Sequence, residues 1–184
     1  MTIKVGIVYF SNTDITGQLA RSAAHGVETA GGEVYSYKIE GSEIRNGRFN
    51  HKHVFYELEG CDAIIFASPT YMGGPAAQFK AFADATSFVY SHQDWRGKVA
   101  AGITSGSGLN GDQTSTLQYF SILASQHGMC WLGISPDLDG SQSTKINRLG
   151  CQLGVVAQSE SDEADEVDLR TAFSLGDRIT RHLV

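Results

Sequence analysis

Three short segments of this 184-residue chain concentrate hydroxyl groups, glycines and an aromatic ring, and each follows an apolar run typical of a buried strand. Parallel strands of an open α/β sheet bring their carboxyl ends to one edge, and ligands bind in the crevice outside that edge. We therefore expect the three segments to form one binding site. Its candidate residues are Ser11, Asn12, Thr13, Asp14, Ile15 and Thr16 in the first segment, Pro69, Thr70, Tyr71, Met72 and Gly73 in the second, and Thr104, Ser105, Gly106, Ser107 and Gly108 in the third.

The first segment has the chemistry of a phosphate site. Its hydroxyls, on Ser11, Thr13 and Thr16, precede an amphipathic helix, whose N-terminus presents unpaired N–H groups and the positive end of a dipole. Charge-assisted hydrogen bonds are each worth about 1.5 to 3 kcal/mol, so several of them would hold a phosphate without any lysine or arginine. The alternative is a simple helix cap made by Thr13 or Asp14, which needs only one such side chain.

The second segment, within residues 68–75, is suited to a flat ring. Tyr71 and Met72 offer apolar contact, while Gly73 and Gly74 allow the backbone to approach a ligand closely. Pro75 fits the first position of a helix. The alternative is an ordinary turn that leads into that helix.

The third segment contains the spacing G-x-G-x-x-G at Gly106, Gly108 and Gly111, between a predicted strand and a predicted helix. That spacing is also the fingerprint of a nicotinamide-binding Rossmann domain. Two features disfavour this alternative. The first strand is followed by hydroxyls instead of glycines, and the acidic residues Asp137 and Asp139 lie farther along the chain than a ribose contact requires.

Alternating strands and helices are expected to position these segments. Strands are predicted at residues 3–10, 33–39, 62–67, 98–104 and 130–134, with further order at 154–157 in the Gly- and Ser-rich connection 135–158. Helices are predicted after residue 16, at 52–59, from Pro75, at 113–126 and at the C-terminus. This pattern is typical of an α/β protein with a parallel sheet, and the length fits one domain over residues 1–184.

Three other features do not belong to the predicted site. Residues 87–97 are long and aromatic for a connection, so we expect a lid or a core plug. His51 and His53 lie two apart, which does not place them on one helix face, and we expect solvated histidines instead of a metal site. The acidic run at 160–168, followed by Arg178 and Arg181, is interpreted as a complement to the dipole of the last helix.

Composition excludes several classes of partner. A net charge of −6 and a pI near 5.4 leave no basic footprint for nucleic acid or an anionic membrane. Cys61, Cys130 and Cys151 have no C-x-x-C spacing and are predicted to be buried free thiols in a reducing compartment. Without a leader-like N-terminus or an apolar segment of membrane-spanning length, the expected location is the cytoplasm.

Together the three segments resemble the flavodoxin fold, with a closer likeness to WrbA-type NAD(P)H:quinone oxidoreductases and related NAD(P)H-dependent FMN reductases. The likeness is carried by residues 68–73, 78–84, 95–98, 104–108 and 127–129. It implies a three-layer α/β sandwich, in which a five-stranded parallel sheet of order 2-1-3-4-5 has helices on both faces. It also implies non-covalent FMN, with the phosphate at residues 11–16 and the ring beside 69–73 and 104–108, and NAD(P)H as the electron donor.

The same resemblance implies that His127 contacts the flavin or the substrate pocket and that Tyr90 lies near the quinone. Tyr90 would wall the flavin slot, or else be a core residue under residues 86–96. Asp14 stands where flavodoxins favour glycine, and it would bring a carboxylate to the phosphate unless it caps backbone N–H groups. The expected assembly is a homodimer or homotetramer.

The predicted activity is transfer of electrons from NAD(P)H, through FMN, to a quinone or a similar small flat acceptor. In this scheme the cofactor carries the redox chemistry and the protein supplies position and polarity. The alternative is a flavodoxin-like electron-transfer protein that binds FMN but has no NAD(P)H turnover of its own. A fold alone cannot separate the two.

Overall fold

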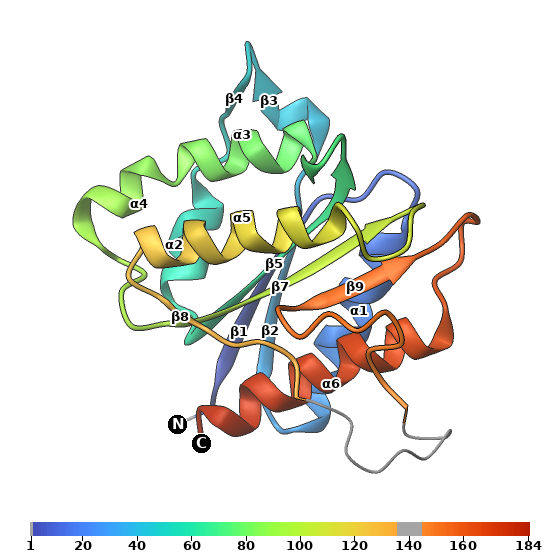
Figure 1. Cartoon of the computed structure of the whole chain (residues 1–184). Helices are drawn as coiled ribbons and strands as arrows, with labels where there is room; N and C mark the ends of the chain where they lie inside the picture. Colours follow the sequence, from blue (N-terminus) through green and yellow to red (C-terminus); the bar gives the residue numbers. More distant parts are fainter. Residues whose placement is uncertain (1, 136–144) are drawn as a thin grey trace.

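The computed structural model describes residues 2–135 and 145–184, and a parallel sheet lies between two layers of helices (Figure 1). Its strands are β1 (Lys4–Tyr9), β2 (Glu33–Lys38), β5 (Ala63–Tyr71), β7 (Val99–Gly106), β8 (Cys130–Trp131) and β9 (Val155–Gln158). The helices are α1 (Ile15–Thr29), α2 (His53–Glu59), α3 (Ala77–Ala85), α4 (Ser87–His92), α5 (Gln113–Gln126) and α6 (Glu166–His182). The expectation for Asp137 and Asp139 lies outside the described residues.

The sheet confirms the predicted topology. Its strands hydrogen-bond in the order β2-β1-β5-β7-β8, all parallel, which is the order 2-1-3-4-5 of the flavodoxin-like fold. The Rossmann alternative is therefore wrong, because that fold has the strand order 3-2-1-4-5-6.

The fifth position of the sheet is shared by two short strands. β8 pairs with the beginning of β7, where Cys130 lies opposite Val99. β9 pairs with the end of β7, where Gln158 lies opposite Gly106, so the order predicted at residues 154–157 is confirmed. The chain thus leaves the sheet after β8 and returns to the same edge at β9.

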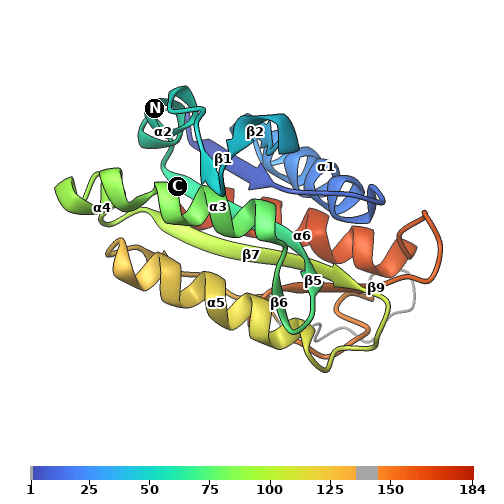
Figure 2. The same ribbon diagram turned by 90° about the horizontal axis from the view of Figure 1, so that it is seen from above.

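Both faces of the sheet are buried by apolar packing. One face is covered by α2, α3, α4 and α5 (Figure 2). There Phe66 of β5 packs against Phe79 of α3 and Phe120 of α5, and all three are fully buried. The opposite face is covered by α1 and α6. These two helices approach closely at Gly26, where a Cβ atom would lie 2.0 Å from the carbonyl oxygen of Phe173.

The predicted loop at residues 68–75 is a hairpin. β5 continues to Tyr71, and β6 (Gly74–Pro75) returns antiparallel to it. Met72 and Gly73 form the two-residue turn with φ of 49° and 79°, as a type I′ turn requires. The prediction that Pro75 opens the next helix is wrong, because Pro75 belongs to β6 and α3 begins at Ala77.

The aromatic segment at residues 87–97 combines a short helix with a core plug. Trp95 is fully buried, whereas Tyr90 on α4 is half exposed and is not a core residue. Of the predicted buried thiols, Cys61 and Cys151 are buried, but Cys130 is exposed because it begins β8 at the edge of the sheet.

The connection after β2 forms a small projecting hairpin. It contains a 3₁₀ turn, η1 (Gly41–Glu43), and the strands β3 (Ile44–Arg45) and β4 (Arg48–Phe49), which stand over α3 in Figure 1.

The dipole interpretation of the last helix is confirmed at its ends, where Glu166 and Asp168 occupy the first turn and Arg181 the last. None of the described helices has both the length and the apolar character needed to cross a bilayer.

Candidate cofactor site

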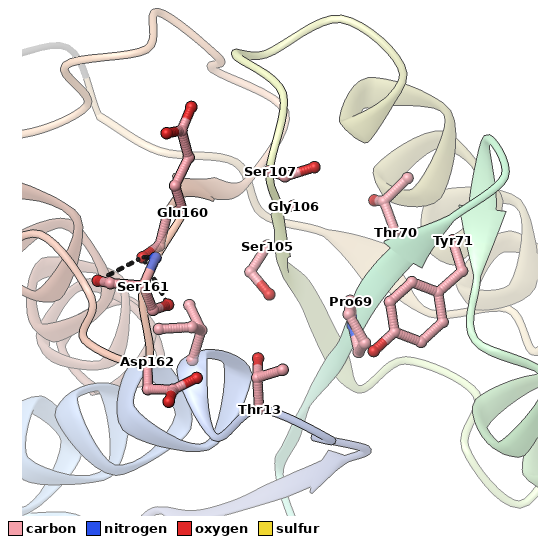
Figure 3. A pocket seen from close by; sticks show the side chains of 12 residues that line it. Thr13, Pro69, Thr70, Tyr71, Ser105, Gly106, Ser107, Glu160, Ser161 and Asp162 are labelled. Carbon is pink, nitrogen blue, oxygen red and sulfur yellow. Dashed lines mark hydrogen bonds between the residues drawn. The ribbon is translucent and has the colours of Figure 1, made fainter.

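A cavity of about 300 Å³ lies at the carboxyl ends of β1, β5 and β7. In Figure 3, Thr13 and Ser105 lie on its floor, with Pro69, Thr70 and Tyr71 on one side and Glu160, Ser161 and Asp162 on the other. A second cavity, of about 630 Å³, lies between the β5–β6 hairpin and the loop after β7. The two cavities share Thr70, Gly106 and Ser107, so they form one continuous slot.

Most of the predicted cofactor residues line this slot. The first cavity contains Thr13, Ile15, Pro69, Thr70, Tyr71, Ser105, Gly106 and Ser107, and the second adds Met72, Gly73 and Gly108. Five predicted residues do not line either cavity, namely Ser11, Asn12, Asp14, Thr16 and Thr104. Their contacts show that several of them shape the slot from behind.

The first turn of α1 is capped by Ser11. The Gly17 N–H donates to the Ser11 Oγ at 3.1 Å, and the Gln18 N–H donates to the Asp14 carbonyl. Neither Thr13 nor Asp14 makes the cap proposed as the alternative to a phosphate site, because the Asp14 side chain has no capping bond. Among the described residues, the N–H groups of Ile15 and Thr16 have no acceptor, and of these two residues Ile15 lines the cavity.

Asp14 adopts a glycine-like conformation and turns to an arginine. Its φ of 67° lies in the left-handed region, which explains why glycine would suit this position. Its carboxylate accepts a hydrogen bond from Arg21 Nη2 at 2.6 Å, and this bond holds the pKa of Asp14 below its usual range. The carboxylate is therefore paired beside the helix start, and it does not line the cavity.

Hydroxyl groups join the strand ends beneath the slot. Thr16 Oγ1 lies 2.8 Å from Ser105 Oγ, and both side chains are buried. Thr104 donates to the Ser68 carbonyl and must then accept from Thr70, whose oxygen lies 2.8 Å away. Thr16 is thus bonded to Ser105, and Thr104 to Ser68 and Thr70, so both hydroxyls hold the loops in place.

Sequence reasoning missed the segment that follows β9. Ser159, Glu160, Ser161 and Asp162 line the first cavity, although the acidic run was interpreted only as part of a helix terminus. This segment is fixed on α1 because Gln18 Nε2 donates to the Asp162 carbonyl at 2.7 Å. The available signal was the Ser-Glu-Ser-Asp sequence directly after a strand, in the same position that identified the other loops.

Tyr90 and His127 lie at the other end of the sheet strands, away from the slot. His127 ends α5 three residues before β8, which pairs with the beginning of β7, whereas the slot lies at the end of β7. Together they line a separate cavity of about 330 Å³, with their ring centroids 5.9 Å apart. Within one chain, the structure does not bring them to the other predicted site residues.

His127 has no N–H left to donate to a ligand. The Thr86 hydroxyl donates to the Ala83 carbonyl, so the 2.9 Å contact between Thr86 Oγ1 and His127 Nε2 requires the histidine to donate. Nδ1 is then an acceptor, and it has no partner among the described residues. Burial lowers the pKa of His127 to about 4, so the ring is neutral at pH 7.

Comparisons with known proteins agree with this geometry. The family profile described as NADPH-dependent FMN reductase matches residues 3–135, which is more than two thirds of the chain. The chain belongs to the NADPH-dependent FMN reductase family. Within the wider similarity, it is 37% identical to the flavodoxin FldP of Pseudomonas aeruginosa, covering 97% of this chain and 95% of that one.

An NAD(P)H dehydrogenase (quinone) of Archaeoglobus fulgidus is 28% identical, with 96% of this chain and 95% of that one covered. Among solved structures, a flavodoxin, WrbA-like protein from Agrobacterium tumefaciens superposes with a TM-score of 0.77 at 34% identity. The match covers 98% of this chain and 97% of that one. The resemblance inferred from the sequence is therefore confirmed.

The slot fits the FMN that membership of this family implies. Its two cavities fall in the size range of small-molecule sites, about 300 to 1,000 Å³. At the α1 end, the unpaired N–H of Ile15 and the Thr13 hydroxyl suit a phosphate, and no described lysine or arginine lines that cavity. At the other end, the β5–β6 hairpin and the glycine loop enclose a space for a ring.

Proposed function

We propose that this protein is an FMN-dependent oxidoreductase that transfers electrons from NAD(P)H to a quinone or a similar small flat acceptor. The observation that carries the proposal is the continuous slot between the start of α1, the β5–β6 hairpin and the loop after β7, in a member of the FMN reductase family. When bound, FMN supplies the two-electron chemistry that links donor and acceptor.

The chain's own residues bind and orient the cofactor. Thr13 and the N–H groups at the start of α1 would hold the phosphate. The ring would be held by Pro69, Thr70, Tyr71, Met72 and Gly73 together with Ser105, Gly106, Ser107 and Gly108. Backbone N–H groups of these two loops would stabilise negative charge that develops on the ring. Glu160 and Asp162 bring like charge to the phosphate cavity, so the helix-end donors must outweigh them.

A second candidate function is electron carriage without NAD(P)H turnover. It is favoured by one observation, the 37% identical relative that is named a flavodoxin. The experiment that separates the two mixes the FMN-loaded protein anaerobically with NADH or NADPH and follows flavin absorbance. Reduction within seconds, followed by reoxidation with a quinone, supports the enzyme. A flavin that stays oxidised with both nucleotides, yet reduces with dithionite, supports the carrier.

We further propose that the protein acts as a homodimer or homotetramer in the cytoplasm. Because Tyr90 and His127 lie away from the slot of their own chain, they can meet a flavin or acceptor only in a second copy. Exposed apolar side chains occur at both places, Met72 and Leu109 beside the slot and Phe88 on the same helix as Tyr90. Three unbridged cysteines suit a reducing compartment.

A further inference from the structure

Two arginines lie opposite each other on the small hairpin that projects after β2. Arg45 on β3 and Arg48 on β4 are cross-strand partners, separated by the turn residues Asn46 and Gly47, whose φ values are 51° and 74°. Side chains at opposed positions of an antiparallel pair point to the same face, with Cβ atoms about 4.5 to 5.5 Å apart. The neighbouring pair, Ile44 and Phe49, packs inward, so the two arginines point outward and are exposed.

This arrangement opposes folding. Like charges directly opposite on a hairpin are destabilising, and no carboxylate of the described residues lies within ion-pair distance of either guanidinium. Several cations of this acidic chain are paired, as Lys38 is with Glu40, but Arg45 and Arg48 have no such partner among the described residues. Two unpaired guanidiniums held side by side match the geometry of a phosphate, which arginine binds through two parallel hydrogen bonds.

A cavity of about 600 Å³ lies beside Arg45, and one further cation, Lys52, lines it. Arg45, His51 and Lys52 all face it. Its one carboxylate, Glu43, already accepts hydrogen bonds from the Tyr37 hydroxyl and from the Glu40 N–H, and it contacts His51 Nδ1 at 2.6 Å. The negative charge of Glu43 is thus engaged within the protein, and the cavity remains suited to an anion.

A second cavity, of about 390 Å³, separates the hairpin from α3. Its lining includes small or apolar residues, among them Ile44, Gly47, Ala77 and Ala81. α3 begins two residues after β6, whose turn with β5 bounds the cofactor slot. In Figure 1 β3 and β4 stand over α3, so this cavity, which Lys80 and Asp84 also line, lies between the helix that follows β6 and the hairpin that carries the two arginines.

We propose that the β3–β4 hairpin binds the adenosine half of NADPH, with Arg45 and Arg48 on the 2′-phosphate and the adenine in the cavity against α3. This inference rests on the proposed function, because it assumes that the nicotinamide ring reaches the flavin slot. It assigns a preference for NADPH over NADH to two residues outside that slot. NADH carries a hydroxyl where NADPH has the phosphate, so it leaves the guanidiniums without a charged partner.

The test measures binding without turnover. Calorimetric titration with 2′,5′-ADP, the phosphorylated adenosine of NADPH, is compared with titration with 5′-ADP. The wild type is expected to bind 2′,5′-ADP about tenfold more tightly, and the double variant Arg45→Gln/Arg48→Gln is expected to lose this preference. The control is Arg181→Gln, which removes one positive charge at the far end of α6 and should leave both affinities unchanged.

Three results would overturn the inference, namely equal binding of the two nucleotides by the wild type, a preference that survives in the double variant, and inorganic phosphate binding as tightly as 2′,5′-ADP. FMN affinity and anaerobic reduction of the wild type are measured separately. If the flavin is not reduced by either nucleotide, the proposed function fails. If it is reduced but the arginines contribute nothing, only the present inference fails.

Discussion

Thr16 on α1 and Ser105 at the end of β7 share a buried hydrogen bond of 2.8 Å between their side-chain oxygens. The two residues are 89 positions apart, and their contact joins the loop assigned to the phosphate with the loop assigned to the ring. The spacing between the two halves of the slot therefore depends on this bond.

Replacing Thr16 by valine should weaken the binding of both FMN and riboflavin. Valine keeps the shape but leaves the buried Ser105 hydroxyl without its partner, at a cost of about 1 to 3 kcal/mol in the free energy of unfolding. Thermal melts and fluorescence titrations with both flavins measure the effect. A loss confined to FMN would show instead that Thr16 contacts the phosphate directly.

Replacing Thr13 by alanine should weaken the binding of FMN but not that of riboflavin. Its hydroxyl lines the cavity at the start of α1 and makes no hydrogen bond to another described side chain. Its removal therefore takes a hydrogen-bond donor from the phosphate and changes the stability of the fold little. We expect FMN to bind about tenfold more weakly and riboflavin unchanged. Equal losses for the two ligands would contradict the phosphate assignment.

Acid should destabilise the protein through His127. Burial lowers the pKa of His127 to about 4, against an ordinary value of 6.5, so the unfolded state binds the proton more readily than the folded state. Stability is then fully present above pH 6.5 and falls as the pH drops towards 4, by about 3 kcal/mol over the whole range.

Chemical unfolding at pH 7.5 and pH 5 measures this slope, with His127→Gln as the comparison. Glutamine can still donate to the Thr86 hydroxyl but does not titrate, so the variant should lose most of the pH dependence. An unchanged slope in the variant would assign the acid sensitivity to other groups.

Replacing Tyr90 by alanine should raise the quinone KM several-fold and leave FMN affinity and melting temperature nearly unchanged. Tyr90 is half exposed and contacts His127 edge to face, so its removal costs little core packing. The variant would lose a flat aromatic face on which an acceptor bound in a neighbouring copy could stack. Such stacking contributes on the order of 1 kcal/mol to binding. A lower melting temperature with an unchanged KM would contradict the role.

Strand positions and most of the slot could be predicted because both leave local signals. β1 and β5 are buried on both faces and consist of continuous apolar runs, and the loops after them carry the hydroxyls and glycines of a binding site. The sequence already disfavoured a Rossmann interpretation of the G-x-G-x-x-G at Gly106, but only the strand order excluded it, and sequence spacing does not determine that order.

Other features depended on contacts between distant residues. Thr104 and Thr16 have the same residue type as Thr13, but tertiary hydrogen bonds occupy their hydroxyls. The cavity wall at Ser159 and Asp162 could not be placed without knowing that β9 returns beside β7. Likewise, His127 and Tyr90 lie in the sequence among the site segments, yet they fold to the other end of the strands.

The division of the fifth strand also bears on solubility. A long strand at a sheet edge exposes a row of unpaired N–H and C=O groups, which can template pairing with another chain. Here the edge beside β7 is filled by a two-residue strand and a four-residue strand, and the chain leaves the sheet between them. Short edge strands are one way in which proteins limit such pairing, and both described strands at this edge are short.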